Sequence, residues 1–294
     1  MNLKPFSGWT AAAGLLAIFL CAPAGHAEAA PRLDNATCLS CHDGRKGKLE
    51  IATAEGASRE LRSVAADALR KSVHASMDCV TCHTDIQDNA ESGNAHHKDP
   101  VLTAARKDCI ACHEDLWQTV KKENRAKDWP RLGVVAENIV DYKGSLHARP
   151  NQDDPTHANA TCEDCHSSHS FNVPPKNSPD YAEWRLGIPK ACGTECHEES
   201  LETYVESIHG RKVLEKHDVK AAVCTDCHTT HAIGNTSATR FKLAITAQCG
   251  NCHEENFKSY KATYHGQINT LGYTYTAKCY DCHGSHGKIG RAHV

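Results

Sequence analysis

The chain has 294 residues and a formal net charge of −3, so its overall charge does not favour nucleic acid or an anionic membrane surface as a partner. Only 6% of the residues are aromatic and the mean hydropathy is negative, which argues against a large core made of apolar side chains alone. The same chain holds 17 cysteines and 21 histidines. Something other than apolar side chains is expected to fill the interior.

Residues 1–29 predict a secretory signal peptide. Lys4 supplies the positive charge, an apolar run extends from Trp9 to Ala22, and small residues follow in the cleavage zone Gly25–Ala29. The run is shorter than the roughly 20 apolar residues that span a bilayer, although an uncleaved N-terminal anchor is the alternative. We therefore expect a mature chain without a transmembrane segment, in the periplasm, secreted or at the cell surface.

Sixteen cysteines remain when Cys21 is assigned to the signal peptide, and they form eight close pairs, each followed directly by a histidine. Seven pairs have the spacing Cys-x-x-Cys-His, and the fifth has one extra residue. In chain order the motifs are Cys38, Cys41 and His42; Cys79, Cys82 and His83; Cys109, Cys112 and His113; Cys162, Cys165 and His166; Cys192, Cys196 and His197; Cys224, Cys227 and His228; Cys249, Cys252 and His253; and Cys279, Cys282 and His283.

This spacing suits covalent attachment of haem c. Two thiols bond the two vinyl groups of one haem, and the adjacent histidine then lies under the iron as its proximal ligand. Zinc sites and disulfides are the alternatives, but neither needs a histidine after every second cysteine. The sequence predicts eight covalently attached haem c groups, including one at the widened fifth motif.

The sixth iron ligands are expected to be histidines, because Met1 and Met77 are the only methionines. An internal repeat nominates them. Motifs 3, 5 and 7 lead to a Ser/Thr-x-His site, which also follows motif 1, and motifs 4, 6 and 8 continue as Cys-x-x-Cys-His-x-x-His. The nominated distal histidines are His74, His147, His209 and His265 in the first group and His169, His231 and His286 in the second. Motif 2 breaks the rule, and either His96 or His97 is the nearest substitute. His157, His217 and His293 are left over, and we interpret them as surface histidines.

The repeat divides the mature chain into four two-haem modules, residues 30–100, 101–180, 181–240 and 241–294, which we expect to form one continuous haem-packed unit. Apolar spacing predicts helices after the odd motifs, with Gly210 and Gly266 at their ends, and a helix over Ser58–Val73. Residues 149–159 and 173–180 predict surface loops. The expected fold class is mainly α with extensive irregular loops, a haem core and little or no β-sheet.

Chain geometry predicts that distal histidines cross between haems. An unbroken helix from His253 to His265 would be about 18 Å long, whereas the two axial nitrogens of one iron are only about 4 Å apart. His286 follows His283 by three residues, which is too little chain to pass around a macrocycle. Each of these histidines is therefore expected to serve a haem held by another motif.

These motifs resemble those of the multihaem c-type cytochrome superfamily, in particular periplasmic cytochromes of anaerobically respiring and metal-reducing bacteria. The resemblance covers nearly the whole mature chain. It implies bis-histidine, low-potential haems and redox-protein partners such as a quinol dehydrogenase, a terminal reductase or an outer-membrane conduit. The widened fifth motif and the missing distal histidine of motif 2 depart from the common pattern.

The resulting hypothesis is an electron-transfer protein rather than an enzyme, with about 33 residues per haem and no segment long enough for a substrate domain. One alternative is a multihaem oxidoreductase of the nitrite, hydroxylamine or tetrathionate type, with one five-coordinate catalytic haem. Another is a homo-oligomeric filament or a subunit of an outer-membrane conduit. The sequence does not name the donor or the acceptor.

Overall fold

A computed structural model describes residues 34–52, 57–84, 86–89, 94–97 and 107–287. The predicted signal peptide, with Cys21 and His26, and the surplus His293 lie outside the described residues.

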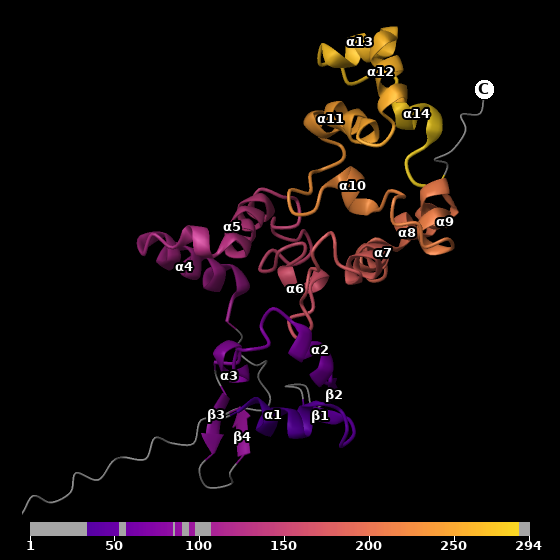
Figure 1. Ribbon diagram of the computed structural model, residues 1–294. Coiled ribbons are helices and arrows are strands. Elements are labelled where there is room, and N and C mark those ends of the chain that lie inside the picture. The colour runs from indigo at the N-terminus through magenta and orange to yellow at the C-terminus, as the bar shows by residue number, and fades with distance from the viewer. Residues whose placement is uncertain (1–33, 53–56, 85, 90–93, 98–106, 288–294) are drawn as a thin grey trace, which may run out of the picture. The chain divides into compact units, whose positions relative to one another are not determined.

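The N-terminal part combines short helices with two small hairpins (Figure 1). Its elements are α1 Asn35–His42, β1 Leu49–Ala52, β2 Ser58–Leu61, α2 Ala66–Lys71, α3 Cys79–Cys82, β3 Ile86–Asn89 and β4 Asn94–His97. Each hairpin is antiparallel, with Leu49 opposite Leu61 in the first and Ile86 opposite His97 in the second. The predicted helix over Ser58–Val73 is wrong in its first part, because Ser58–Leu61 pairs with β1 and the helix begins only at Ala66.

The next part of the chain is a pair of helices followed by a short motif helix. Its elements are α4 Cys109–Lys122, the 3₁₀ turn η1 Ala126–Asp128, α5 Pro130–Lys143 and α6 Cys162–Cys165. Asp108 caps α4 by accepting a hydrogen bond from the Ala111 amide at 2.7 Å, and Pro130 stands in the first turn of α5, where its missing N–H costs nothing. Helices α4 and α5 contact each other.

Two successive sets of four helices then repeat the same order, as Figure 1 shows in salmon-red to yellow. The first set is α7 Asp180–Gly193, α8 Glu198–Glu206, α9 Ile208–Leu214 and α10 Cys224–His228. The second is α11 Thr239–Gly250, α12 Glu254–Ala262, α13 Tyr264–Thr270 and α14 Cys279–His283. In each set, the first helix contacts the second and the second contacts the third.

Gly210 and Gly266 do not end a helix, contrary to the prediction. They lie in the first turns of α9 and α13, after breaks in the helix at Ser207 and Thr263. The amides of Gly210 and Gly266 donate hydrogen bonds to the hydroxyls of Ser207 and Thr263 at 2.9 and 3.1 Å. The chain passes so close to the preceding helix that a Cβ on Gly210 would overlap the carbonyl oxygen of Tyr204. Glycine is needed here for close approach rather than for helix termination.

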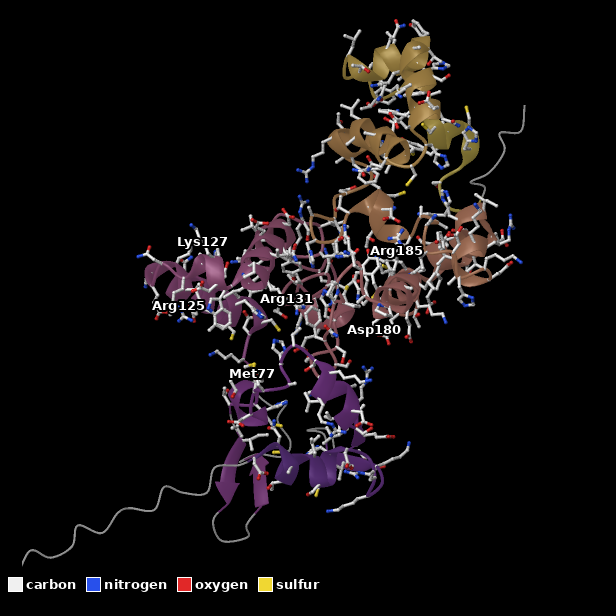
Figure 2. The ribbon with its side chains drawn as sticks, in the orientation of Figure 1. Met77, Arg125, Lys127, Arg131, Asp180 and Arg185 are labelled. Carbon is white, nitrogen blue, oxygen red and sulfur yellow. The ribbon has the colours of Figure 1, made fainter. Side chains whose placement is uncertain are left out.

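The polypeptide supplies little core of its own. Within the described residues the buried apolar side chains are Val120, Ile139, Tyr204, Val213, Ala221 and Val223. The last three form a cluster with Leu186, Ile188 and Leu214, and beside it Arg185 donates to both carboxylate oxygens of Asp226, at 3.2 and 2.7 Å (Figure 2). A chain of this length normally buries far more apolar surface, so the interior needs additional apolar material.

The expected fold class is confirmed: the structure is mostly helical, with many short helices and loops and little strand. The predicted loops at residues 149–159 and 173–180 are also free of helices and strands until α7 begins at Asp180. Within the described part of the chain, none of the helices has the length and apolar character that a membrane crossing needs.

Candidate haem-binding site

Seven of the eight motifs place the histidine at or beside a helix end, whereas His113 of motif 3 lies inside α4. In motifs 4, 6 and 8 the cysteines lie on the short helices α6, α10 and α14, and an aspartate between them caps the helix. Asp164, Asp226 and Asp281 accept hydrogen bonds from the backbone amides of Thr161, Val223 and Lys278 at 2.6, 2.7 and 2.7 Å. This local cap fixes both cysteines and the following histidine on one short turn.

Six histidines from the motifs face six of the nominated distal histidines, with ring centroids 6.0–6.2 Å apart and interplanar angles of 19–40°. The pairs are His74 with His113, His83 with His169, His147 with His197, His166 with His231, His209 with His253, and His228 with His286.

This separation fits one iron between two imidazoles. With metal–nitrogen bonds of about 2 Å and a nitrogen about 1.1 Å from the ring centre, two axial imidazoles on one iron have centroids about 6.3 Å apart. Direct stacking of two rings would instead bring the centroids closer. Among the described residues no group of three or more His, Cys, Asp or Glu side chains converges on one metal position.

The pairs follow a rule of direction. A Ser/Thr-x-His histidine faces the odd motif of the next module, as His209 of the third module faces His253 of motif 7. A Cys-x-x-Cys-His-x-x-His histidine faces the even motif of the preceding module, as His286 of motif 8 faces His228 of motif 6. Each of these junctions between successive modules therefore holds one pair in each direction, and no described pair joins two histidines of one motif.

The extra residue of motif 5 has a structural explanation. It lies in the turn between α7 and α8, and His197 precedes α8 with backbone angles close to those of His253 before α12.

Burial lowers the pKa of seven of the paired imidazoles and so favours the neutral form that offers a lone pair to a metal; they are His74, His147, His166, His209, His228, His231 and His286. Burial, with a smaller contribution from His231, lowers the pKa of His166 to about 4. Burial is also the main cause of the lowered pKa values of His74, His147 and His209, and the facing histidine adds to it. The Nδ1 of His113 lies 2.8 Å from the Cys109 carbonyl oxygen, a contact that orients the ring and leaves Nε2 for the iron.

Cysteines of different motifs also meet. The side chains of the first cysteines of the two motifs in one module are close enough to affect each other's ionisation: Cys38 with Cys79, Cys109 with Cys162, Cys192 with Cys224, and Cys249 with Cys279. Burial, with a smaller contribution from Cys38, raises the pKa of Cys79 to about 11, whereas the interaction with Cys249 lowers the pKa of Cys279 to about 6. Because each sulfur would be bonded to a macrocycle edge, these contacts place two attachment edges side by side.

Across the junctions, second cysteines of successive motifs are close enough to interact electrostatically. Burial is the main cause of the raised pKa of Cys82, and the neighbouring thiol of Cys112 adds to it. Burial also raises the pKa of Cys165, with contributions from Cys192 and Cys196. Cys252 does the same for Cys227. Together with the contacts inside modules, each motif from 1 to 8 therefore adjoins the next motif in the sequence.

Comparison with known proteins adds a family motif. Residues 217–258 match the doubled CXXCH motif. The matched segment contains motifs 6 and 7, so the doubled motif here spans a junction between two predicted modules. Such motifs bind haem c covalently, and a multihaem arrangement of this kind implies haem-based electron transfer. The chain has no significant match among curated proteins or solved structures.

The remaining nominated histidines lie outside the six pairs. His96 and His97 belong to β4, and the structure does not describe their side chains, so the choice between them stays a prediction. His265 is exposed, and among the described residues its ring contact is with Tyr264. His157 is on the surface, with its Nδ1 2.8 Å from an Asp154 carboxylate oxygen. Met77, at the connection between α2 and α3, is half-buried (Figure 2).

The sequence did not identify a tyrosine hydrogen bond that recurs in three modules and that we call the tyrosine tie. Tyr142, Tyr204 and Tyr260 each donate a hydrogen bond to a carbonyl just before an even motif, namely those of Ala160, Ala222 and Ala277, at 2.8, 2.7 and 3.0 Å. Each tyrosine stands three residues before the Ser/Thr of the Ser/Thr-x-His site, so the spacing Tyr-x-x-Ser/Thr-x-His was the available signal. The tie connects the helix that precedes the distal histidine to the next attachment motif.

Removing one tie should destabilise the protein measurably. Tyr204 is buried and its hydroxyl donates to the partly buried Ala222 carbonyl, so Tyr204→Phe should lower the free energy of unfolding by about 1–2 kcal/mol. Denaturant unfolding followed by tryptophan or haem absorbance measures the change. Tyr264→Phe is the matched control, because Tyr264 is 74% exposed, and it should be neutral. Equal effects of the two variants would contradict a structural role of the tie.

Proposed function

We propose that this chain is an exported octahaem c-type cytochrome that conducts electrons along a line of eight closely packed, mostly bis-histidine and low-potential haems arranged in sequence order. Its role would be to connect a redox-protein donor with a redox-protein acceptor in anaerobic or extracellular respiration, and not to transform a substrate. The signal-like N-terminus supports export, and the periplasm or the cell surface is the proposed location.

The observation that carries the proposal is the set of six histidine pairs at 6.0–6.2 Å. Bound haem supplies one-electron redox chemistry at its iron. The chain's own residues attach and orient it: the cysteines hold the macrocycle edges, and two imidazoles occupy the axial positions at each paired site. With both positions filled by protein at six sites, those sites leave no place for a substrate at the metal.

The thiol contacts support the linear order. Motifs 3 and 4 meet through Cys109 and Cys162, and motifs 4 and 5 through Cys165 and the cysteines of motif 5. Contact between attachment edges requires neighbouring macrocycles to lie close together, which short-range electron exchange needs. Histidine at both axial positions of the six paired sites favours low potentials, since a methionine ligand would raise the potential of a haem.

A haem count on the secreted protein tests this proposal. We expect the mature holoprotein to carry eight haems per chain by intact mass and by absorbance of the alkaline pyridine complex. Electron paramagnetic resonance of the oxidised protein should show low-spin ferric signals for the six paired sites. Fewer than eight haems would contradict the octahaem assignment, and a predominantly high-spin spectrum would contradict bis-histidine ligation.

A further inference from the structure

The fourth module contains a buried charge beside a haem-attachment motif. Lys278 is 3% exposed, and among the buried residues of the described part of the chain it is the one with a charged side chain. It lies directly before Cys279 and is the N-cap residue of α14, which carries motif 8. Attachment of the haems adds material around it and can only bury it further. A buried ammonium group is costly unless protein groups replace its water, so its partners need an explanation.

Two backbone carbonyls solvate this ammonium group. Nζ of Lys278 donates to the carbonyl oxygens of Thr274 and Thr276 at 2.5 and 2.8 Å, and it lies 6.0 Å from the centre of the Tyr280 ring. The aspartate of motif 8, Asp281, accepts instead from the backbone amide of Lys278 at 2.7 Å. An aspartate occupies this position in motifs 4, 6 and 8 alike, so the charge that is particular to motif 8 is that of the lysine.

The repeat shows that the lysine is not needed to fill space. In the third module three positions form a buried apolar cluster, whereas in the fourth the same positions hold buried polar side chains. The equivalent pairs are Val213 and Asn269, Ala221 and Thr276, and Val223 and Lys278. An apolar side chain is therefore compatible with this position of the fold, and it would carry no desolvation cost. A local rule broken in this way favours a functional explanation.

The third module also places a cation at the equivalent carbonyls, but it supplies a counter-ion. Arg185 of α7 donates to the carbonyl oxygens of Val219 and Ala221 at 2.8 and 3.1 Å, and a carboxylate oxygen of Asp226 lies 2.7 Å from its guanidinium group. These two carbonyls stand five and three residues before the first cysteine of motif 6, as the partners of Lys278 do before motif 8. The two modules thus solvate a cation at the same place, and the ion pair of the third reduces the field of its cation.

We propose that the ammonium group of Lys278 raises the reduction potential of the haem attached by Cys279 and Cys282, and makes it the haem of highest potential in the line. The proposal rests on the proposed function, since it needs a haem at motif 8 and neighbouring haems that exchange electrons with it. Reduction adds one negative charge to a haem, so a fixed positive charge beside the attachment edge stabilises the reduced form.

The consequence is a direction of electron flow. Each step moves one electron from a ferrous iron to a ferric iron, no bond forms or breaks, and the redox-protein donor of the proposed function supplies the electron. Electrons that enter elsewhere on the line collect at motif 8, because the reduced state is most stable there. Lys278 acts here through its charge and touches no iron.

Removing the charge tests the proposal. At an effective dielectric constant of about 20, a unit charge about 10 Å from an iron changes the equilibrium constant for one-electron reduction by about tenfold, or about 59 mV. Lys278→Gln removes the charge and keeps a donor for one carbonyl. We expect the motif 8 haem of the mature holoprotein to become harder to reduce by about this factor, with smaller changes at the other haems. Paramagnetic NMR of the haem methyl groups during a potentiometric titration follows each haem, and contacts with Tyr280 assign the motif 8 haem.

Two further variants separate charge from structure. Lys278→Arg keeps the charge and should retain most of the potential. Thr276→Ala is the matched neutral control, because it alters the same buried cluster, introduces the residue of the third module and changes no charge. It should leave the potential of the motif 8 haem unchanged. An unchanged potential in Lys278→Gln overturns the proposal, and so does an equal shift in Thr276→Ala.

The unmodified protein provides a measurement that does not depend on the folding of any variant. In the same titration its motif 8 haem should be the first to be reduced, and a different haem of higher potential would overturn the proposal. The haem count of the unmodified protein is measured beforehand. Fewer than eight haems would count against the proposed function, whereas a full complement with the wrong order of potentials counts against the role of Lys278 alone.

Discussion

His209→Ala should convert one low-spin haem of the oxidised protein to a high-spin haem while the covalent haem count stays unchanged. The ring of His209 faces His253 with centroids 6.2 Å apart, so its loss removes the second imidazole from the haem held by Cys249 and Cys252. Electron paramagnetic resonance counts the high-spin signal, and carbon monoxide titration of the reduced protein should show about one additional binding site per chain.

Double variants identify which iron is affected. His147 faces His197 of motif 5, so His209→Ala with His147→Ala should give two additional carbon monoxide sites, because two different irons lose a ligand. His157→Ala is the neutral control, since this side chain pairs with Asp154 on the surface. An unchanged spin state in His209→Ala, or a single new site in the double variant, would contradict the cross-module pairing.

Gly210→Ala should be among the most destabilising single substitutions in the described part of the chain, at about 3 kcal/mol or more. A Cβ at this position would overlap the carbonyl oxygen of Tyr204 and lie 3.0 Å from the Cα of Val205, and neither backbone atom can move without shifting α8. The added methyl group also displaces the turn that carries His209. Denaturant unfolding should show the loss of stability, together with a partial high-spin signal.

Gly187→Ala is the matched control for this substitution. Gly187 lies inside α7 with no atom within 4 Å of a Cβ, so alanine should stabilise the protein by about 0.5–1 kcal/mol through helix propensity. Opposite signs for the two variants would separate the steric requirement at Gly210 from a general effect of glycine. If Gly210→Ala is neutral, the close approach of α9 to Tyr204 is wrong.

The sequence predicted the mainly α fold class because the motifs and the apolar spacing after them are local signals. It could not predict the break at Thr263. Capping by Thr263 and the close passage at Gly266 depend on where α12 lies, so the expected straight helix from His253 to His265 is divided into α12 and α13. The hairpin at Ser58–Leu61 was missed for a similar reason, since strand pairing with β1 overrides the apolar spacing of that segment.

The chemistry of the candidate site was more predictable than its pairing. Cysteine spacing names the attachment residues, because two bonds to one macrocycle require neighbouring thiols. The partner of His286 depends on tertiary structure: three residues of chain exclude His283, but only the arrangement of modules selects His228. The sequence also nominated His265 as a distal ligand, because its local setting equals that of His209, and this assignment stays a prediction.

The two-way exchange of histidines at each junction bears on how such a chain could have grown. A duplicated unit inserted between two existing ones would bring one imidazole for its successor and one for its predecessor, as the unit containing His147 and His169 does. Every iron on either side of the insertion would keep two nitrogens, and neither end of the protein would change. Inserting a unit between two existing units therefore leaves the number of axial histidines per iron unchanged, whereas losing or adding a unit at an end alters the ligands of a haem there.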